Sequence, residues 1–301
     1  MMKKLLLLFS VLSLAFVFTL SASAQEYEFQ TLDGKDYIED ENTKIIDHVV
    51  YRLCEVNTID DHYDVYDWFD SKETFETLEE INIVSEIDGI KVKGIMCRLY
   101  YDSYTGFNHR YVGYYSNYSV KKVTIPDTIE KIGDGVFSIF KGLEELVIPA
   151  SVNFDDNYHC FDYMESLKNL TFLGDIYYLP DGISDKFENV TINGSVTFIS
   201  GGAFKNCTSL KSFKILGNLG GEFLGTIGGF GGNVFKNCTS LEEVVLPKEA
   251  EDFRISKSDF EGCISLKSIT LPEKCGELTI ADDAFRGCTS LETVTLPKKS
   301  D

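Results

Sequence analysis

Apolar and polar positions repeat along the second half of the chain in one short pattern. The pattern is L-x-x-V-x-L-P, and clear copies begin at Leu143, Leu241, Leu266 and Leu291. Closely spaced apolar residues, many of them β-branched, predict a short strand of about five residues in each copy. The proline that follows has no amide proton for a sheet ladder, and we therefore expect it to end the strand.

Weaker copies of the pattern begin at Val120, Leu167, Phe187 and Leu210, and the weakest begins at Leu78. The residue directly after each start checks this alignment independently, because acid and base alternate through all nine copies. We expect these residues to form a charge ladder on the strand face. They are Glu79, Lys121, Glu144, Lys168, Glu188, Lys211, Glu242, Lys267 and Glu292.

The rest of each repeat predicts a second strand and a corner. Second apolar segments stand at 195–200, 252–256 and 277–281. In the corner DAFRGCTSL, the residues Phe285, Cys288 and Leu291 are three apart, which is typical of one face of a helical turn.

So short a repeat cannot bury its apolar side alone, whereas stacked copies can cover one another. The fold class predicted is therefore a right-handed solenoid of short β-strands and turns, of the leucine-rich-repeat kind, with a parallel β-sheet on one face. Equivalent residues would form rows with a spacing of about 4.8 Å. Alternating charges would then lie side by side, and a slip by one coil would oppose like charges, so we expect the ladder to help fix the register.

The segments AFKNCTSLKSFKI (203–215) and AFRGCTSLETVTLP (284–297) resemble the BspA-like bacterial leucine-rich repeats. The resemblance covers about 118–297, and 81–95 is similar to the first coil of that family, with an Asp-Gly turn between two strands. It implies a secreted or surface protein that binds other macromolecules, most often in adhesion, without a shared catalytic site. The chain departs from the pattern at Met164, which replaces a cysteine, and in the short coil at Phe187, where we expect a distorted turn.

The N-terminal third predicts several further segments. Lysines followed by an apolar run and small residues indicate a signal peptide over 1–24, cleaved after Ala24. We expect a flexible acidic leader at 25–44, an α/β or β cap at 45–77 that includes a strand from Ile45, and the solenoid at 78–301. The solenoid would contain an insert at 96–118 and a flexible glycine-rich loop at 217–233.

The charge and the signal peptide narrow the location and the partners. The formal net charge is −20, and removal of Lys3 and Lys4 with the signal peptide would make it −22. Such acidity opposes binding to nucleic acid or anionic lipid. We expect a secreted, periplasmic or cell-surface protein with no integral membrane segment after cleavage and no nucleic-acid partner.

Cysteines recur in the repeat, three residues before four of its starts. Disulfides are common in exported chains, but their Cβ atoms must converge, whereas equivalent side chains of a stack point the same way. We therefore expect buried free thiols that pack as small hydrophobic residues at Cys207, Cys238, Cys263 and Cys288. Cys54, Cys97, Cys160 and Cys275 lie off the pattern, and a bond between Cys54 and Cys97 is left open.

Candidate binding residues lie in the tyrosine-rich insert, because tyrosine combines a large contact area with a polar tip. They are Tyr100, Tyr101, Tyr104, Phe107 and Tyr111, although these rings could instead pack on the solenoid. We expect a protein or glycan ligand, no catalytic residues, no metal and no cofactor. Two alternatives are a hydrolytic, for example carbohydrate-active, enzyme that uses the aspartate-rich segment 60–70, and a self-assembling envelope protein that forms end-to-end homodimers.

Overall fold

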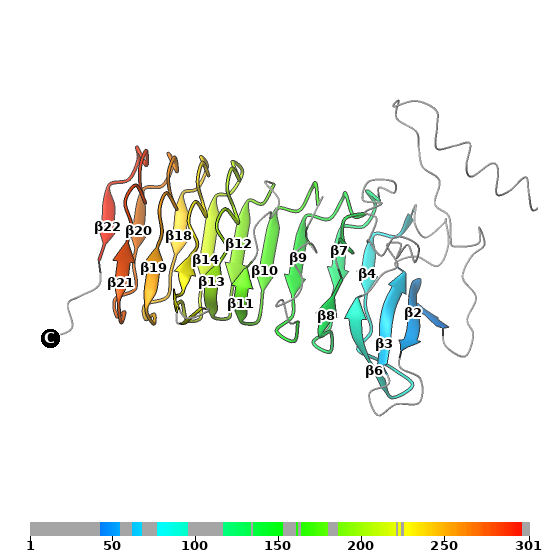
Figure 1. The fold of residues 1–301 in the computed structure, drawn as a ribbon. Helices are drawn as coiled ribbons and strands as arrows, with labels where there is room; N and C mark the ends of the chain where they lie inside the picture. The colour runs from blue at the N-terminus through cyan, green and yellow to red at the C-terminus, as the bar shows by residue number, and fades with distance from the viewer. Residues whose placement is uncertain are drawn as a thin grey trace, which may run out of the picture.

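A computed structural model describes residues 43–54, 62–67, 77–95, 117–133, 135–152, 161, 164–179, 186–220, 222–223 and 226–296. Short strands stack along the chain into a rod whose coils follow one another from β7 to β22 (Figure 1). The predicted solenoid of short strands and turns is confirmed.

The first side of the rod is a parallel seven-stranded sheet in the order β22-β20-β18-β14-β12-β10-β9. Each strand follows one of the predicted repeat starts. A parallel pair, β4 (Glu80–Asn82) and β7 (Lys122–Thr124), precedes this sheet in the chain. The seven strands are β9 (Glu145–Ile148), β10 (Asn169–Phe172), β12 (Asn189–Ile192), β14 (Ser212–Ile215), β18 (Glu243–Val245), β20 (Ser268–Thr270) and β22 (Thr293–Thr295).

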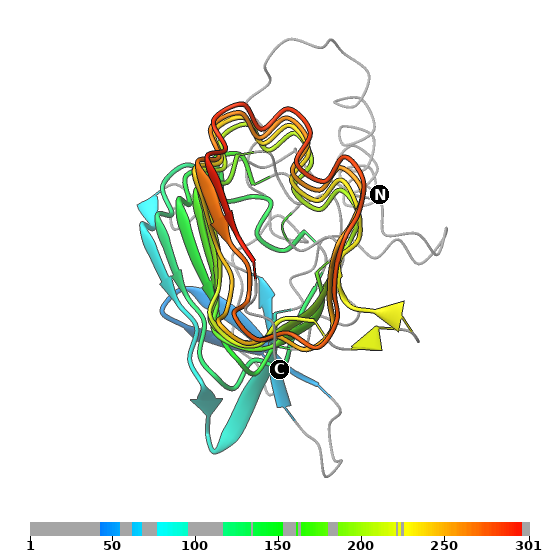
Figure 2. The ribbon, with the colours of Figure 1, turned by 90° about the vertical axis from the view of Figure 1, so that its left-hand side faces the viewer.

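A second parallel sheet covers another side of the coils, so the expectation of a sheet on one face was too narrow (Figure 2). Its strand order is β11-β13-β17-β19-β21, and three of these strands lie in the segments predicted as second strands. The strands are β11 (Ile176–Leu179), β13 (Val196–Ile199), β17 (Gly229–Phe230), β19 (Phe253–Ile255) and β21 (Leu278–Ile280).

Backbone hydrogen bonds confirm the alignment of the repeats through the degenerate copy at Phe187. The amide N–H of Glu188 donates to the carbonyl O of Lys168 at 2.8 Å, and that of Lys211 donates to Glu188 O at 2.7 Å. The same bond joins Lys168 to Glu144 at 2.9 Å. Residues that follow the repeat starts therefore form a row along the rod.

The interior is a set of apolar columns, one residue from each coil. Phe204, Phe235, Phe260 and Phe285 stack in sequence, with ring centroids 5.5, 5.2 and 5.2 Å apart. The first three rings are fully buried, whereas Phe285 of the last described coil is partly exposed. Each coil thus completes the core of its neighbour, as expected for a repeat that cannot fold alone.

The corners are successive tight turns and not the helical turn that the three-residue spacing suggested. The amide of Cys288 bonds to the carbonyl of Phe285 at 3.2 Å, and that of Leu291 to Cys288 at 3.1 Å, so the three-residue spacing does recur. Gly287 between them has a φ of +75°, and Asn237, the equivalent residue two coils earlier, has +62°. A residue with a positive φ, the left-handed backbone conformation, interrupts a right-handed helix. Glycine and asparagine are the residues that tolerate this conformation best.

The N-terminal cap is a β-sheet that continues into the first coil. Its path is β1 (Thr43–Ile46), β2 (Val49–Cys54), β3 (His62–Asp67), β6 (Ile90–Ile95) and β5 (Glu86–Ile87), and β8 (Lys131–Ile132) also pairs with β6. The fully buried Tyr51 joins cap and coil, because its hydroxyl accepts a hydrogen bond from the amide of Val84 at 3.1 Å.

Two details of the predicted cap are wrong. The strand expected from Ile45 is a hairpin, because Asp47 and His48 take φ values of 47° and 70° and reverse the chain. Two consecutive positive φ values are typical of a two-residue hairpin turn. The strand β1 also begins at Thr43, within the segment 25–44 expected to be a flexible leader.

The glycine-rich segment 217–233 is more ordered than the predicted flexible loop. It contains an antiparallel hairpin of β15 (Glu222–Phe223) and β16 (Thr226–Ile227), followed by β17 of the second sheet. Figure 2 shows this hairpin standing off the coils on the side of the second sheet.

Candidate binding faces

The outer face of the seven-stranded sheet is built by alternation along each strand. In β10 and β12 the residues Leu170, Phe172, Val190 and Ile192 point inward and are almost completely buried. The residues between them point outward and form rows across the sheet, because the strands are parallel and in register. We call this surface the strand face.

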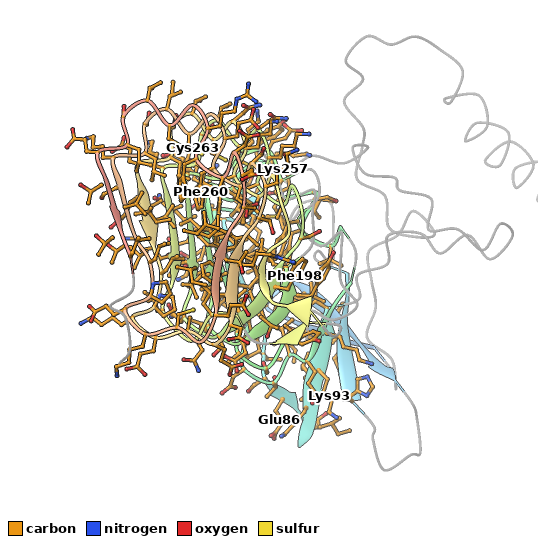
Figure 3. The ribbon with its side chains drawn as sticks, turned by 60° about the vertical axis from the view of Figure 1, so that its left-hand side comes forward. Glu86, Lys93, Phe198, Lys257, Phe260 and Cys263 are labelled. Carbon is orange, nitrogen blue, oxygen red and sulfur yellow. The ribbon has the colours of Figure 1, made fainter. Side chains whose placement is uncertain are left out.

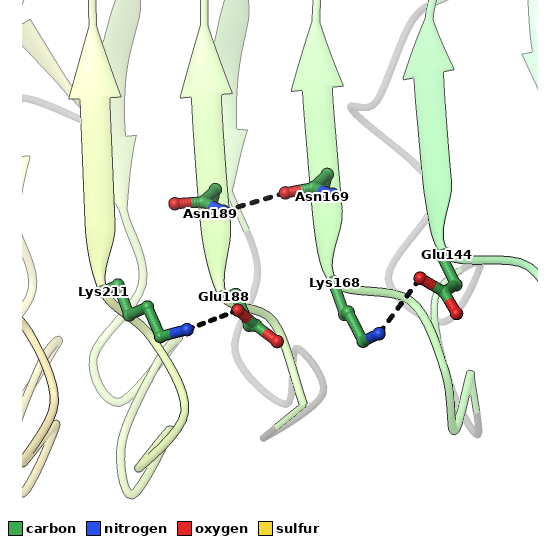
Figure 4. A network of polar contacts seen from close by, with 6 residues as sticks. All are labelled: Glu144, Lys168, Asn169, Glu188, Asn189 and Lys211. Atoms are coloured by element: carbon green, nitrogen blue, oxygen red, sulfur yellow. Dashed lines mark hydrogen bonds and ion pairs between the residues drawn. The ribbon is translucent and has the colours of Figure 1, made fainter.

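Four charged residues of the ladder form two ion pairs at the beginnings of neighbouring strands of the strand face (Figure 4). Lys168 Nζ lies 3.0 Å from Glu144 Oε2, and Lys211 Nζ lies 2.6 Å from Glu188 Oε2. The hydrogen bond to Glu144, with its charge, raises the pKa of Lys168. The hydrogen bond from Lys211, with its charge, lowers the pKa of Glu188. Among the described residues, the ladder positions that form no ion pair are Glu79, Lys121, Glu242, Lys267 and Glu292.

Reversing one ladder charge tests the role proposed for these pairs. Lys168→Glu places three carboxylates in consecutive coils, and we expect the unfolding free energy to fall and to recover partly as salt screens the repulsion. Urea unfolding at low and high salt measures both effects. The matched variant Lys267→Glu also places three carboxylates in consecutive coils but breaks no ion pair, so it should lower the unfolding free energy less; equal losses would contradict a contribution from the ion pair of Lys168 with Glu144.

Uncharged polar side chains lie further along the same strands, after the ion pairs. Asn189 Nδ2 donates to Asn169 Oδ1 at 2.8 Å, which leaves Asn169 Nδ2 as a donor and Asn189 Oδ1 as an acceptor for a partner (Figure 4). Thr171 and Thr191 are paired in register beside the two asparagines and are partly exposed. This central patch of amides and hydroxyls can donate and accept hydrogen bonds without a net charge.

The second sheet has a different outer face. Tyr178 pairs in register with Phe198, and their rings lie 8° from parallel with centroids 6.0 Å apart. In the next two strands the register continues through Gly229 to Arg254. We call these four residues the aromatic row. The sequence pattern does not predict it, because the second strands are unevenly spaced along the chain.

The repeated cysteines are free thiols, as predicted. Cys207, Cys238 and Cys263 are buried, and Cys288 is partly buried in the last described coil. Cys263 Sγ donates to the carbonyl O of Phe235 at 3.1 Å, and Cys238 Sγ donates to that of Phe204 at 3.0 Å. Each thiol thus satisfies a corner carbonyl of the preceding coil, and burial raises the pKa of Cys238 and Cys263.

A thiol titration checks this assignment. We expect the buried thiols to be unreactive toward a thiol reagent in the folded protein, because both access and the thiolate form are suppressed. In denaturant without reductant, at least the five thiols at 207, 238, 263, 275 and 288 should react. Fewer than five would contradict the free-thiol assignment.

Asp259 is a buried carboxyl at a position that Ala203, Val234 and Ala284 occupy in other coils. Its side chain is fully buried, and its oxygens accept hydrogen bonds from the amides of Val234 and Ser256. Burial raises its pKa to about 6, although those bonds and the charge of Arg254 lower it in part.

This raised pKa predicts a dependence of stability on pH. The folded protein holds the proton of Asp259 more tightly than the unfolded chain, so the stabilisation is complete below about pH 4 and is lost as the pH rises through about 6. The effect should be on the order of 3 kcal/mol. Urea unfolding from pH 4 to 7, compared with Asp259→Asn, isolates this group; parallel curves for the two proteins would refute the prediction.

Several predicted sites fall outside the described residues. These include the signal peptide, Cys97 and the candidate binding residues Tyr100, Tyr101, Tyr104, Phe107 and Tyr111, which remain predictions. Of the aspartate-rich segment 60–70, residues 62–67 form β3, which pairs with β2 and β6 inside the cap sheet. Within the described part of the chain, no three His, Cys, Asp or Glu residues are grouped as metal ligands.

The last described coil leaves part of its apolar interior uncovered. Leu296 is 60% exposed and Ile280 is 40% exposed, whereas the equivalent residues one coil earlier, Leu271 and Ile255, are almost completely buried. End-to-end association of two chains stays a prediction.

No helix in the described part of the chain has the length and apolarity needed to cross a membrane.

Comparison with known proteins assigns the class of protein that this stack defines. Residues 111–221 and 223–301, more than half of the chain, match the BspA type leucine rich repeat region in 6 copies. The chain therefore belongs to the family of BspA-type leucine-rich-repeat proteins. A search of curated proteins finds no match.

Solved structures similar to the chain are bacterial leucine-rich-repeat proteins. One from Eubacterium ventriosum is 20% identical with a TM-score of 0.43, and the match covers 86% of this chain and 51% of that one, so this chain spans about half its length. A leucine rich cell surface protein from Faecalibacterium prausnitzii is 18% identical, with a TM-score of 0.27 and coverages of 85% and 89%. The pneumococcal vaccine antigen PcpA is 16% identical, with a TM-score of 0.29 and coverages of 84% and 81%.

Proposed function

We propose that this protein is a non-catalytic scaffold that binds a protein or glycan partner outside the cytoplasm, and that the strand face is its contact surface. Membership of the BspA-type family supports a role in interaction at a surface. The signal-like segment 1–24 and the acidic composition support export.

The observation that carries the choice of surface is the central patch of the strand face. Two ion pairs lie beside this patch, Lys168 with Glu144 and Lys211 with Glu188. The charges next to the patch therefore already compensate one another. Asn169, Asn189, Thr171 and Thr191 present amide and hydroxyl groups on a rigid, in-register sheet. Because the sheet already fixes the spacing of these side chains, ordering them when a partner binds costs little free energy.

Binding to arrays of extracellular matrix proteins and glycans tests this function. After a partner is found, the double variant Thr171→Arg/Thr191→Arg should weaken its binding by about tenfold or more, because two bulky charges occupy the centre of the contact. The control Thr208→Arg/Thr239→Arg places the same change at the corners and should leave binding intact.

The tyrosine-rich insert supplies the contrasting outcome. If the strand-face variant binds normally while Tyr100→Ala/Tyr101→Ala/Tyr104→Ala abolishes binding, the contact surface is the insert. If no extracellular protein or glycan binds at all, the scaffold function itself is refuted.

A further inference from the structure

The charge ladder is complementary to itself when two strand faces meet. A two-fold axis that runs along the strands, between two neighbouring coils, brings the faces together and reverses the order of the coils. It keeps each residue at its own height along the strand. Because acid and base alternate from coil to coil, every ladder residue that has a counterpart then lies opposite one of the other sign. An axis through a coil would oppose like charges, so the ladder also selects the offset between two copies.

One such axis, between β10 and β12, matches the ladder residues that have no ion pair. Lys121 and Glu242 stand in the third coil on either side of this axis, and Glu79 and Lys267 stand in the fourth. Lys121 therefore faces Glu242 of a second copy, and Glu79 faces its Lys267. All four side chains are exposed, and none of them forms an ion pair within the described part of the chain. An axis one coil away in either direction pairs none of these four with one another.

The asparagines beside the same axis are complementary in their hydrogen bonds. Within one chain Asn189 Nδ2 donates to Asn169 Oδ1, so a donor on Asn169 and an acceptor on Asn189 are left over (Figure 4). The axis places Asn169 opposite Asn189 of the second copy, and the free donor of each chain meets the free acceptor of the other. Thr171 and Thr191, which are paired in register, meet in the same way.

The matching surface is large enough for a weak, reversible dimer. Eight of the nine repeat copies have a counterpart under this axis, and the last copy, at Leu291, does not. Coils about 4.8 Å apart, with about 16 Å for the five residues after each repeat start, give a contact of about 600 Å² per chain. The total of about 1,200 Å² lies at the lower end of specific interfaces.

The net charge of the chain opposes this contact little, because the strand face is nearly neutral. In the eight paired copies, the first, second and fourth residues after each start include seven acids and six lysines. On these three rows no residue faces one of its own charge, and Lys122 faces Glu243 of the second copy. Charges elsewhere on the rod are screened beyond about 8 Å at physiological ionic strength.

We propose that the strand face binds a second copy of this chain, in a two-fold dimer with antiparallel rods and its axis between β10 and β12. Lys168 and Lys211 of each chain, already paired with Glu144 and Glu188, also face Glu188 and Glu144 of the other chain. A continuous network of charges then lies beside the asparagines. This inference rests on the proposed function, because it takes the strand face as the contact surface, and it names the protein partner.

Two charge-reversed variants test the pairing against each other. The acidic variant is Lys121→Glu/Lys267→Glu and the basic variant is Glu79→Lys/Glu242→Lys, so like charges meet in either homodimer. Sedimentation velocity should show the wild-type chain passing from monomer to dimer between about 1 and 100 μM, as expected for so small a contact. Each variant alone should dimerise about tenfold or more weakly. An equimolar mixture should dimerise like the wild type, because every reversed residue then faces an opposite charge.

The controls carry the same changes of net charge away from the strand face. Lys257 follows β19 and opens the corner that carries Phe260 (Figure 3), and Lys205 lies in the corner of an earlier coil. Lys205→Glu/Lys257→Glu matches the acidic variant. Glu251→Lys/Glu277→Lys, in the turns before β19 and β21, matches the basic one. Both controls should dimerise like the wild type, and thermal unfolding by circular dichroism confirms that each variant is folded.

Three results would overturn the proposal. They are a wild-type chain that stays monomeric over this range, an equimolar mixture that does not recover the dimer, and a dimer abolished by Leu296→Arg but not by the charge reversals. The last result would place the contact at the open end of the last coil. The dimer can form when no partner is found on the arrays, and a partner can bind when no dimer forms, so this proposal and the scaffold function can fail separately.

Discussion

Phe260→Ala should lower the unfolding free energy by about 3–5 kcal/mol, the usual effect of removing a buried phenylalanine. The ring is fully buried, stacks on Phe235 and Phe285 at 5.2 Å, and meets the edge of Phe230 at 5.9 Å. Loss of these aromatic contacts adds to the cavity that the substitution creates. Urea unfolding followed by far-UV circular dichroism measures the change, because the single tryptophan, Trp68, is remote in sequence from these coils.

Phe285→Ala is the matched control, since it removes the same ring from the same position of the next coil. Phe285 is only partly buried and stacks on one neighbour of the column, so its loss should be clearly smaller. Hydrogen exchange should show the effect of Phe260→Ala concentrated in β18 and β20, because each coil depends on its direct neighbours. Equal losses for the two variants would contradict the stacked-column account.

Gly194→Ala should be the most damaging small substitution in the described coils. The added methyl would fall on the backbone carbonyl of Gly174, and Gly217 is packed against Gly194 in the same way. A backbone cannot move aside as a side chain can. We expect a loss at or above the upper end of the 1–3 kcal/mol that overpacking usually costs, about 3 kcal/mol or more.

The control for this prediction is Gly89→Ala in the first coil. Gly89 has a φ of +84° but no atom within 4 Å of its would-be Cβ, so only backbone strain opposes the change. That strain costs about 1–2 kcal/mol. Thermal unfolding of both variants separates steric collision from backbone conformation; a larger loss for Gly89→Ala would mean that the close approach of the coils is unimportant.

The sequence predicts the stack well because every coil repeats its physical requirements. The copy at Phe187 is nearly unrecognisable by its apolar residues, yet the acid at Glu188 continues the alternation and its backbone lies in the predicted row. The cysteine positions are predictable for the same reason, since a residue that recurs in one place of a coil faces the interior in every copy.

Features that do not recur are the ones that pattern alone does not predict. The hairpin at Asp47–His48 lacks the Asn-Gly or Asp-Gly signal of a two-residue turn, so the pattern predicts one strand where the structure has two. Gly229 lies in a strand of the second sheet, yet the sequence predicts a loop there, because glycine contributes nothing to apolar periodicity. The corner residues were predictable in principle, since an asparagine or a glycine directly precedes each repeated cysteine, at Asn206, Asn237, Gly262 and Gly287.

The direction of the coil-to-coil hydrogen bonds has a mechanical consequence. The bonds from Lys168 to Glu144 and from Glu188 to Lys168 join successive coils and therefore run along the rod. Tension between the two ends loads them lengthwise, a few at a time, so the molecule should extend by releasing coils one after another at modest force. A scaffold that acts as proposed would then lengthen under flow and dissipate work before its contact with a partner breaks.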